Sequence, residues 1–329
     1  MLYIIIFFSI SYFWYYCYKN QRKVTNKTLA WIMFGLGLFV GLGDMLGGYD
    51  RYIYAELFDN TADTVLSGKN PLKIDGGIMG YANERAYVYL NVLLAHFTAN
   101  RYIFILIVTL FIYALLYDSL KTYFEEYPFA ILLFLGLFYF FTYTYLRQVL
   151  ATCFTWYSFR FIIKRKFIPY LLCVIIAYNF HNSAIIFFPM YFVPIKKYSK
   201  RTIIIAMVAF LLIGTLGLST SLYSMYGDVS GTDSRTEQYG EDRGFRIEYV
   251  IEVVLFLYFI LKNYHTIPSK DKDLVFLNAS LLFFGVLLAF IKSSTAGRQT
   301  WYFMIGLIYT LNTVALTKQR INNYGKVIY

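Results

Sequence analysis

The chain has 329 residues, of which 59% are hydrophobic and only 15% charged, and its formal net charge is +11. A soluble domain usually has about 25% charged residues, so this composition excludes a water-soluble fold. It also argues against a nucleic-acid-binding protein, because the basic residues form short clusters between apolar segments and not one basic face.

The apolar segments predict an all-α polytopic integral membrane protein with about eleven transmembrane helices and one re-entrant or interfacial helix. About 20 apolar residues cross a bilayer as a helix. A membrane barrel would show alternating segments of about ten residues, whereas these segments are continuously apolar. The predicted spans cover residues 2–18, 29–46, 102–120, 128–144, 146–163, 167–180, 183–195, 202–220, 247–263, 274–291 and 299–317.

Clusters of Lys and Arg between the spans predict the orientation, because such clusters are typical of cytoplasmic loops. We expect the following clusters in the cytoplasm: Lys19, Arg22, Lys23 and Lys27; Lys164, Arg165 and Lys166; Lys196, Lys197, Lys200 and Arg201. The N-terminus then lies outside and the C-terminus in the cytoplasm. Residues 1–329 form one transmembrane domain with outer loops at 47–85 and 221–246. Residues 2–18 are expected to be a first span and not a cleaved signal peptide, since no basic stretch precedes them.

Residues 86–98 are apolar, but a full crossing there would conflict with the sides assigned to Arg147 and to the Lys164 cluster. We therefore predict that this stretch is the re-entrant or interfacial helix, whose backbone is satisfied internally.

The sequence predicts no metal and no cofactor. Cys17, Cys153 and Cys173 lie inside apolar segments, at spacings that indicate neither a disulfide framework nor a metal site. No glycine loop of the kind that cradles phosphates is present.

Ionisable residues close to the spans are the candidate functional residues, because a charge at the bilayer centre costs about 2.5 to 3.5 kcal/mol. Arg147 and Arg298 each open a span and are followed by Gln148 and Gln299. Interfacial arginines that snorkel to the bilayer surface are the structural alternative. His181 lies in an apolar stretch at the tip of a helical hairpin, where a packing role is the alternative.

Two acidic residues complete this set. Asp50 and Arg51 follow the second span, with solvated loop charges as the alternative, and Glu84 precedes residues 86–98, where it would also suit a helix N-terminus. Asp44 and Glu252 are lesser candidates. The predicted topology brings Arg147, His181, Arg298, Asp50 and Glu84 toward the outer side of the membrane.

This combination of residue types favours glycosyl transfer from a lipid-linked diphosphate. Guanidinium groups donate paired hydrogen bonds to phosphate oxygens, and a nearby carboxylate or histidine accepts a proton from an attacking hydroxyl. The predicted catalytic residues are Arg147, His181, Glu84 and Asp50. The residues predicted to bind the diphosphate or the glycan are Arg147, Arg298, Arg51, Gln148 and Tyr302.

The chain resembles the EpsG family, a branch of the Wzy-like exopolysaccharide and O-antigen polymerases. The motifs that carry the resemblance are Gly48-Tyr49-Asp50-Arg51-Tyr52 with Phe58, Glu84 with Tyr87 and Leu90, Arg147-Gln148-Val149-Leu150-Ala151, and Phe180-His181-Asn182-Ser183-Ala184. Residues 221–246 show no family pattern, so the resemblance assigns no role to Arg235, Arg243 or Arg246.

The resemblance implies a metal- and nucleotide-independent glycosyltransferase of the bacterial cytoplasmic (inner) membrane, for which a GT-C-like helical bundle is the expected fold. It would join polyprenyl-diphosphate-linked oligosaccharide repeat units on the outer face, for exopolysaccharide, capsule or O-antigen. A flippase and a chain-length regulator are the implied protein partners. Three alternatives stay open on the residues alone: a polysaccharide flippase or transporter, a membrane acyltransferase that uses a histidine, and a transferase of single sugars.

Overall fold

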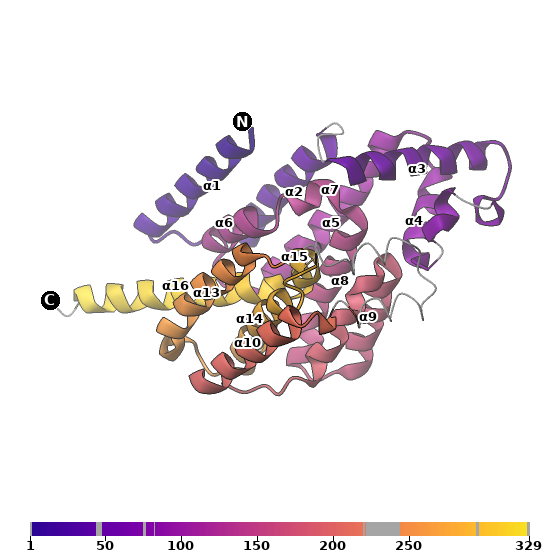
Figure 1. Ribbon diagram of the computed structural model, residues 1–329. Helices are drawn as coiled ribbons and strands as arrows, with labels where there is room; N and C mark the ends of the chain where they lie inside the picture. Colours follow the sequence, from indigo (N-terminus) through magenta and orange to yellow (C-terminus); the bar gives the residue numbers. More distant parts are fainter. Residues whose placement is uncertain are drawn as a thin grey trace. The chain divides into compact units, whose positions relative to one another are not determined.

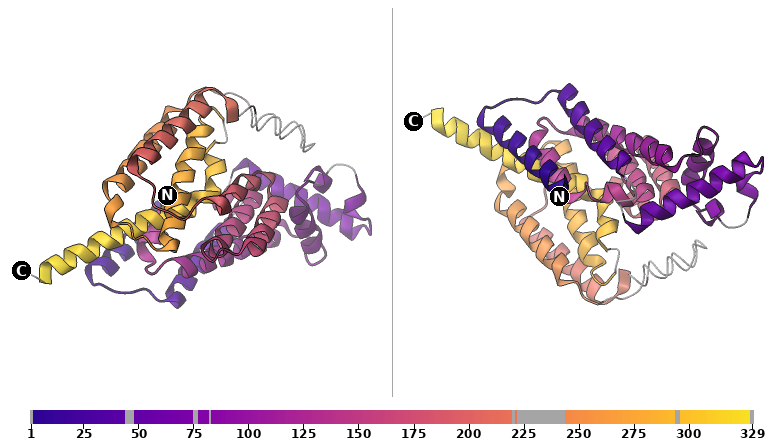
Figure 2. Two further views of the ribbon diagram at one scale, coloured as in Figure 1. Left: turned by 90° about the horizontal axis from the view of Figure 1, so that it is seen from below. Right: turned by 90° about the horizontal axis from the view of Figure 1, so that it is seen from above.

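The computed structural model describes residues 2–43, 48–74, 77–81, 83–219, 221, 244–293 and 296–327 (Figures 1 and 2). These residues form α-helices and 3₁₀ helices, and the described part of the chain contains no β-strand. They cluster into two compact units: Met1–Phe161 with Lys166–Phe188, and Ile162–Arg165 with Pro189–Tyr329. The all-α fold predicted from the sequence is confirmed, whereas the single transmembrane domain stays a prediction.

The first unit consists mainly of helices that precede residue 189. They are α1 (Leu2–Lys19), α2 (Asn26–Leu42), α3 (Tyr49–Leu66), η1 (Pro71–Lys73), η2 (Gly77–Tyr81), α4 (Arg85–Ala95), α5 (Arg101–Tyr123), α6 (Pro128–Leu137), α7 (Phe141–Thr144), α8 (Leu146–Ile163), α9 (Phe167–Phe180) and η3 (Asn182–Phe192), which extends into the second unit.

Close packing of α2 on α5 depends on glycine. A Cβ atom at Gly37 would lie 2.9 Å from the Tyr113 ring, and one at Gly41 would lie 2.8 Å from Leu106. Helix α3 is joined to α5 by an ion pair between Asp59 and Arg101. Because α3 and α4 also pack on each other, these two helices have a defined position in this unit.

The second unit is arranged around α14 (Asp271–Ala289), which is buried along most of its length. Its other helices are α10 (Lys200–Thr215), α13 (Ile247–Lys262), η4 (Tyr264–Thr266), α15 (Ala296–Thr300), η5 (Trp301–Phe303) and α16 (Met304–Val327). A Cβ atom at Gly306 of α16 would lie 2.6 Å from the Cβ of Ala279, so glycine is required where α16 crosses α14.

Two described helices, α5 and α14, are long and apolar enough to cross a membrane. Shorter apolar helices are α2, α6, α9 and η3. At 1.5 Å per residue, the 23 residues of α5 extend roughly 35 Å, more than the hydrocarbon core of a bilayer. Eleven crossings therefore stay a prediction. The three cysteines are buried and free, as the sequence predicts.

Three predicted segments differ from the observed elements. The span predicted at 128–144 is interrupted between α6 and α7, and the one at 183–195 is largely the 3₁₀ helix η3, which contains Pro189. Proline lacks the N–H that an α-helix requires. The predicted outer loop 47–85 contains the 18-residue helix α3, whose buried positions include Arg51, Tyr54 and Phe58. When hydropathy is averaged over this segment, its polar residues offset its apolar ones, so the average does not reveal an amphipathic helix.

The predicted interfacial stretch 86–98 forms most of α4, which has 11 residues. A helix of that length extends roughly 16 Å, about half of the hydrocarbon core, and is too short for a full crossing. Asp44, Arg235, Arg243 and most of the predicted loop 221–246 lie outside the described residues.

Candidate functional site

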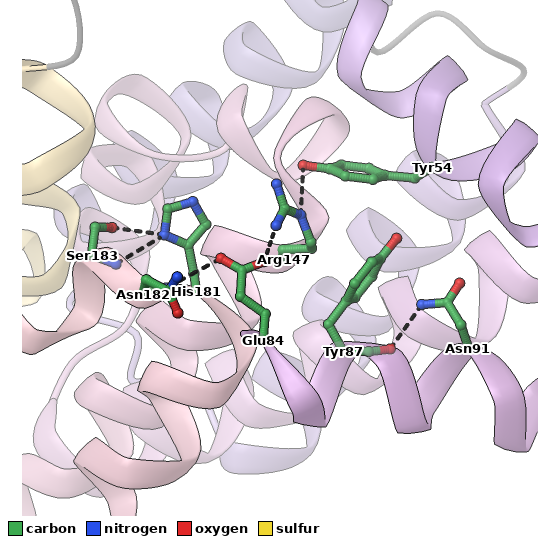
Figure 3. A network of polar contacts seen from close by, with 8 residues as sticks. All are labelled: Tyr54, Glu84, Tyr87, Asn91, Arg147, His181, Asn182 and Ser183. Atoms are coloured by element: carbon green, nitrogen blue, oxygen red, sulfur yellow. Dashed lines mark hydrogen bonds and ion pairs between the residues drawn. The ribbon is translucent and has the colours of Figure 1, made fainter. Parts of the chain in front are cut away.

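An ion pair between Arg147 and Glu84 forms the centre of the candidate site (Figure 3). Arg147 is the second residue of α8, and Glu84 is the N-cap residue of α4. The side chains are 12% and 8% exposed, so the pair is largely removed from water. The Glu84 side chain makes no capping hydrogen bond to α4. Its carboxylate is therefore directed to Arg147, which disfavours helix capping as its main task.

Three tyrosine rings enclose the guanidinium group of Arg147. Its Cζ lies 4.2 Å from the ring centre of Tyr81 and 5.5 Å from those of Tyr54 and Tyr87. Its Nε donates to the Tyr54 hydroxyl over 3.4 Å. The rings come from η2, α3 and α4, so three elements fix one cation. An arginine held in this way is not extended toward a bilayer surface, which disfavours the snorkelling interpretation.

The turn between α9 and η3 is tied to the same carboxylate. The backbone N–H of Asn182 donates to Glu84 Oε1 over 3.2 Å (Figure 3). In the preceding residue, His181, Nδ1 lies 2.7 Å from the Ser183 hydroxyl and accepts from the Ser183 backbone N–H over 3.3 Å. Since an N–H group can only donate, the contact from the Ser183 N–H suits the tautomer with Nδ1 as acceptor and the ring proton on Nε2. In that tautomer His181 offers an N–H donor at Nε2.

Asp50 and Gln148 belong to the same unit as this centre. Asp50 lies in the first turn of α3, where the positive end of the helix favours a carboxylate. It precedes Tyr54 by four residues and so shares a helix face with it. Gln148 follows Arg147 directly and is 1% exposed. The structure therefore assembles Arg147, Glu84 and the His181 turn, with Asp50 one helical turn from Tyr54.

The sequence pattern of the EpsG family matches residues 28–329. This chain belongs to the EpsG family. The family supports a function related to that of Wzy-like polysaccharide polymerases and, together with the apolar helices, indicates a membrane protein. Neither a curated protein nor a solved structure matches the chain.

Arg51 has a structural task in this EpsG protein. It is 1% exposed, and its guanidinium donates to the carbonyl oxygens of Gly43 (2.7 Å), Val40 (2.9 Å), Tyr143 (3.3 Å) and Gly41 (3.4 Å). Three of these carbonyls belong to the C-terminal end of α2, which is the negative end of the helix dipole. Arg51 thus holds the end of α2 beside residue 143, and the predicted role in substrate binding has no support in these contacts.

Arg298 and Tyr302 belong to the second unit of the EpsG chain. Arg298 lies in α15, half-buried, with its Cζ 6.0 Å from the Trp301 ring centre. Tyr302 in η5 is fully buried. Joint action of these two residues with Arg147 stays a prediction.

Sequence analysis missed a further ion pair, between Arg160 of α8 and Asp118 of α5. The Arg160 Cζ lies 3.7 Å from the Tyr157 ring centre, and its backbone N–H donates to the Tyr123 hydroxyl over 3.0 Å. Asp118 and Arg160 both lie inside predicted spans. A charged residue within a span is a signal that would have revealed both of them. Tyr54 and Tyr81 were also missed, because no sequence pattern distinguishes them from the other tyrosines.

Proposed function

We propose that this EpsG family member is a polysaccharide polymerase that joins polyprenyl-diphosphate-linked oligosaccharide repeat units by glycosyl transfer on the outer face of the cytoplasmic membrane. The observation that carries the proposal is the buried Arg147–Glu84 ion pair, which is enclosed by three tyrosine rings and tied to the His181 turn. A buried charge pair of this kind costs free energy to desolvate, so it favours a functional role over a purely stabilising one.

The position of the centre along α8 supports the outer face. Arg160 lies thirteen residues after Arg147, which corresponds to roughly 20 Å along the helix axis. Lys164, Arg165 and Lys166 lie four to six residues after Arg160, and such a cluster is typical of the cytoplasmic side. Arg147 then belongs to the outer end of α8. This orientation is part of the proposal, with eleven crossings, an outer N-terminus and a cytoplasmic C-terminus.

Arg147 binds the diphosphate of the donor in the proposed reaction. Without substrate, its charge is neutralised by Glu84. The phosphate oxygens of an arriving donor replace that carboxylate, because a guanidinium group donates two parallel hydrogen bonds to phosphate. As the diphosphate departs, the same group stabilises the negative charge that develops on it. Arg298 is the proposed second ligand of the diphosphate.

Glu84, released from Arg147, is the proposed base. The hydroxyl oxygen of the acceptor sugar attacks the anomeric carbon of the donor sugar, and a new C–O bond forms. The bond between that carbon and the diphosphate oxygen breaks, and its electron pair leaves with the polyprenyl diphosphate. The hydroxyl proton passes to the Glu84 carboxylate. His181 donates its Nε2 proton in a hydrogen bond to the leaving diphosphate, and Asp50 is the alternative base.

The remaining assignments concern the glycan. We assign the rings of Tyr54 and Tyr81 to the faces of the sugars, because an aromatic ring offers an apolar face and a polar edge. Gln148 and Tyr302 are proposed to bind glycan or diphosphate oxygens. A flippase and a chain-length regulator are the proposed partners in the membrane.

The test is electrophoresis of surface glycan and of lipid-linked intermediates from a deletion strain. The strain is complemented with the wild type, with Arg147→Ala, or with the control Arg160→Lys, which preserves the charge at the other end of α8. Removing one oriented charge at such a site costs about 10² to 10³ in rate. We expect single lipid-linked repeat units to accumulate with Arg147→Ala but not with the control. Normal polymer from Arg147→Ala would contradict the proposal, and repeat units trapped on the inner face would indicate a flippase.

A further inference from the structure

An apolar cavity of about 170 Å³ lies between α10 and α14 in the second unit. Residues from both helices line it, including Ala206, Met207 and Leu281. An apolar cavity of about 150 Å³ holds a benzene ring, so this one accepts a comparable piece of hydrocarbon. Thr202, which also lines it, is exposed, so the cavity is reached from outside the protein.

Helix packing explains where the cavity lies. A Cβ atom at Gly214 of α10 would lie 2.1 Å from the Leu288 carbonyl oxygen, and one at Gly285 of α14 would lie 2.7 Å from the Phe210 ring. These contacts have the same order along both helices, so α10 and α14 run parallel and meet most closely toward their C-terminal ends. The cavity lies on the N-terminal side of these two close contacts, where Ala206 leaves space.

The loop before α10 forms a fixed rim of this cavity through Val193 and Tyr198. Asn278 of α14 donates to the Pro194 carbonyl over 3.0 Å, and the Tyr264 hydroxyl donates to the Tyr198 carbonyl over 2.7 Å. Lys197 donates to the Ile267 carbonyl over 2.8 Å, and burial lowers the pKa of its ammonium group. Lys197 therefore helps to hold the loop in place.

Three exposed cations, Lys196, Lys200 and Arg201, lie in the same stretch of the chain as the rim residues. They flank the cavity residues Tyr198 and Thr202, and the ion pairs found among the described residues do not include them. Helix α10 begins at Lys200, so its positive end adds to the same charge. Anionic phosphate next to a hydrocarbon chain matches this arrangement of cations beside an apolar cavity.

We propose that this cavity and its basic rim bind one anionic glycerophospholipid of the cytoplasmic leaflet. Part of an acyl chain occupies the space beside Ala206, and the phosphate contacts Lys196, Lys200 and Arg201. The inference rests on the membrane location of the protein and on the orientation given under the proposed function, and not on the polymerisation reaction. A lipid bound there would fasten α10 to α14 without taking part in glycosyl transfer.

Native mass spectrometry of the full chain in detergent, titrated with phosphatidylglycerol or phosphatidylcholine, tests the proposal. The wild type should bind phosphatidylglycerol at least about tenfold more tightly, since each basic residue near an anionic lipid contributes about fivefold. The triple variant Lys196→Gln, Lys200→Gln, Arg201→Gln should lose this preference. The matched control, Lys19→Gln with Arg22→Gln and Lys23→Gln, removes three charges elsewhere and should keep it.

Ala206→Phe tests the cavity, because the added ring occupies the space of the acyl chain. Its binding of phosphatidylglycerol should fall at least about tenfold while its elution in gel filtration stays that of the wild type. If Ala206→Phe does not fold, Ala206→Leu serves the same purpose. Unchanged binding in a folded cavity variant, or equal wild-type affinity for the two lipids, would overturn the proposal. Tighter binding of a polyprenyl phosphate than of phosphatidylglycerol would overturn it as well.

Discussion

Replacing both partners of the Arg147–Glu84 pair separates its contribution to stability from its contribution to catalysis. Arg147→Ala leaves a carboxylate that is 8% exposed, with the Asn182 N–H as its remaining hydrogen bond. Removing one partner of a buried ion pair costs about 3 to 5 kcal/mol. In the double variant Arg147→Ala, Glu84→Gln no charge is left unpaired, and the lost stacking on tyrosine rings costs about 1 to 2 kcal/mol. The double variant should therefore be more stable than Arg147→Ala by about 2 to 3 kcal/mol.

The assay is equilibrium unfolding in mixed micelles with increasing SDS, combined with polymer formation by the same preparations. Stability should recover in the double variant, whereas polymer formation should be lost in both. A double variant no more stable than Arg147→Ala would refute the buried pair as the cause of the stability loss. Polymer formation by the double variant would refute the catalytic assignment.

Other residues give predictions of different kinds. His181→Gln keeps an N–H donor and should retain at least tenfold more polymerisation than His181→Ala; equal losses would contradict the donor role. Arg51→Met should lower the free energy of unfolding by about 3 kcal/mol, because it leaves helix-end carbonyls unpaired. Turnover per folded molecule should stay unchanged, and a lower turnover at unchanged stability would instead assign Arg51 to the substrate. Gly306→Leu should prevent α16 from packing on α14 and abolish the folded peak in size-exclusion chromatography; Gly35→Leu, where nothing lies within 4 Å, is the control. A normal Gly306→Leu peak would contradict this packing.

The sequence was sufficient to select the residues of the central ion pair. Arg147 and Glu84 are charged residues at the ends of apolar segments, and a membrane tolerates such charges only where they are paired or used. His181 was selected as a polar residue in an apolar hairpin. The structure brings Glu84 to Arg147 and places the N–H beside His181 on the same carboxylate. The catalytic roles of these residues stay predictions.

Arg51 shows what the sequence could not distinguish. Like Arg147, it is an arginine beside an apolar segment, but its guanidinium donates to backbone carbonyls at the end of α2, whereas Arg147 pairs with a carboxylate. This difference depends on where α2 ends and which carbonyls lack a helical partner. Tyr54 and Tyr81 beside Arg147 are equally hidden, because the chain has 34 Tyr and only the fold decides which of them face one cation.

The break between α6 and α7 and the helical form of α3 depend on local packing. Hydropathy averaged over a window reports how apolar a segment is, but not whether its backbone continues as one helix. Helix α3 is on average as polar as a loop. One of its faces is nevertheless buried, and that face includes Tyr54 and Phe58. Such a face becomes visible only when its partners, α4 and α5, are known.

The most direct test of the Arg147 centre is a reaction of the purified full chain, reconstituted in liposomes, with lipid-linked repeat units. The quantities to measure are new glycosidic bonds and released polyprenyl diphosphate. We predict one released diphosphate for each bond formed by the wild type, and neither product from Arg147→Ala, Glu84→Gln. Polymer growth by that double variant, or bond formation by the wild type without release of polyprenyl diphosphate, would contradict the account.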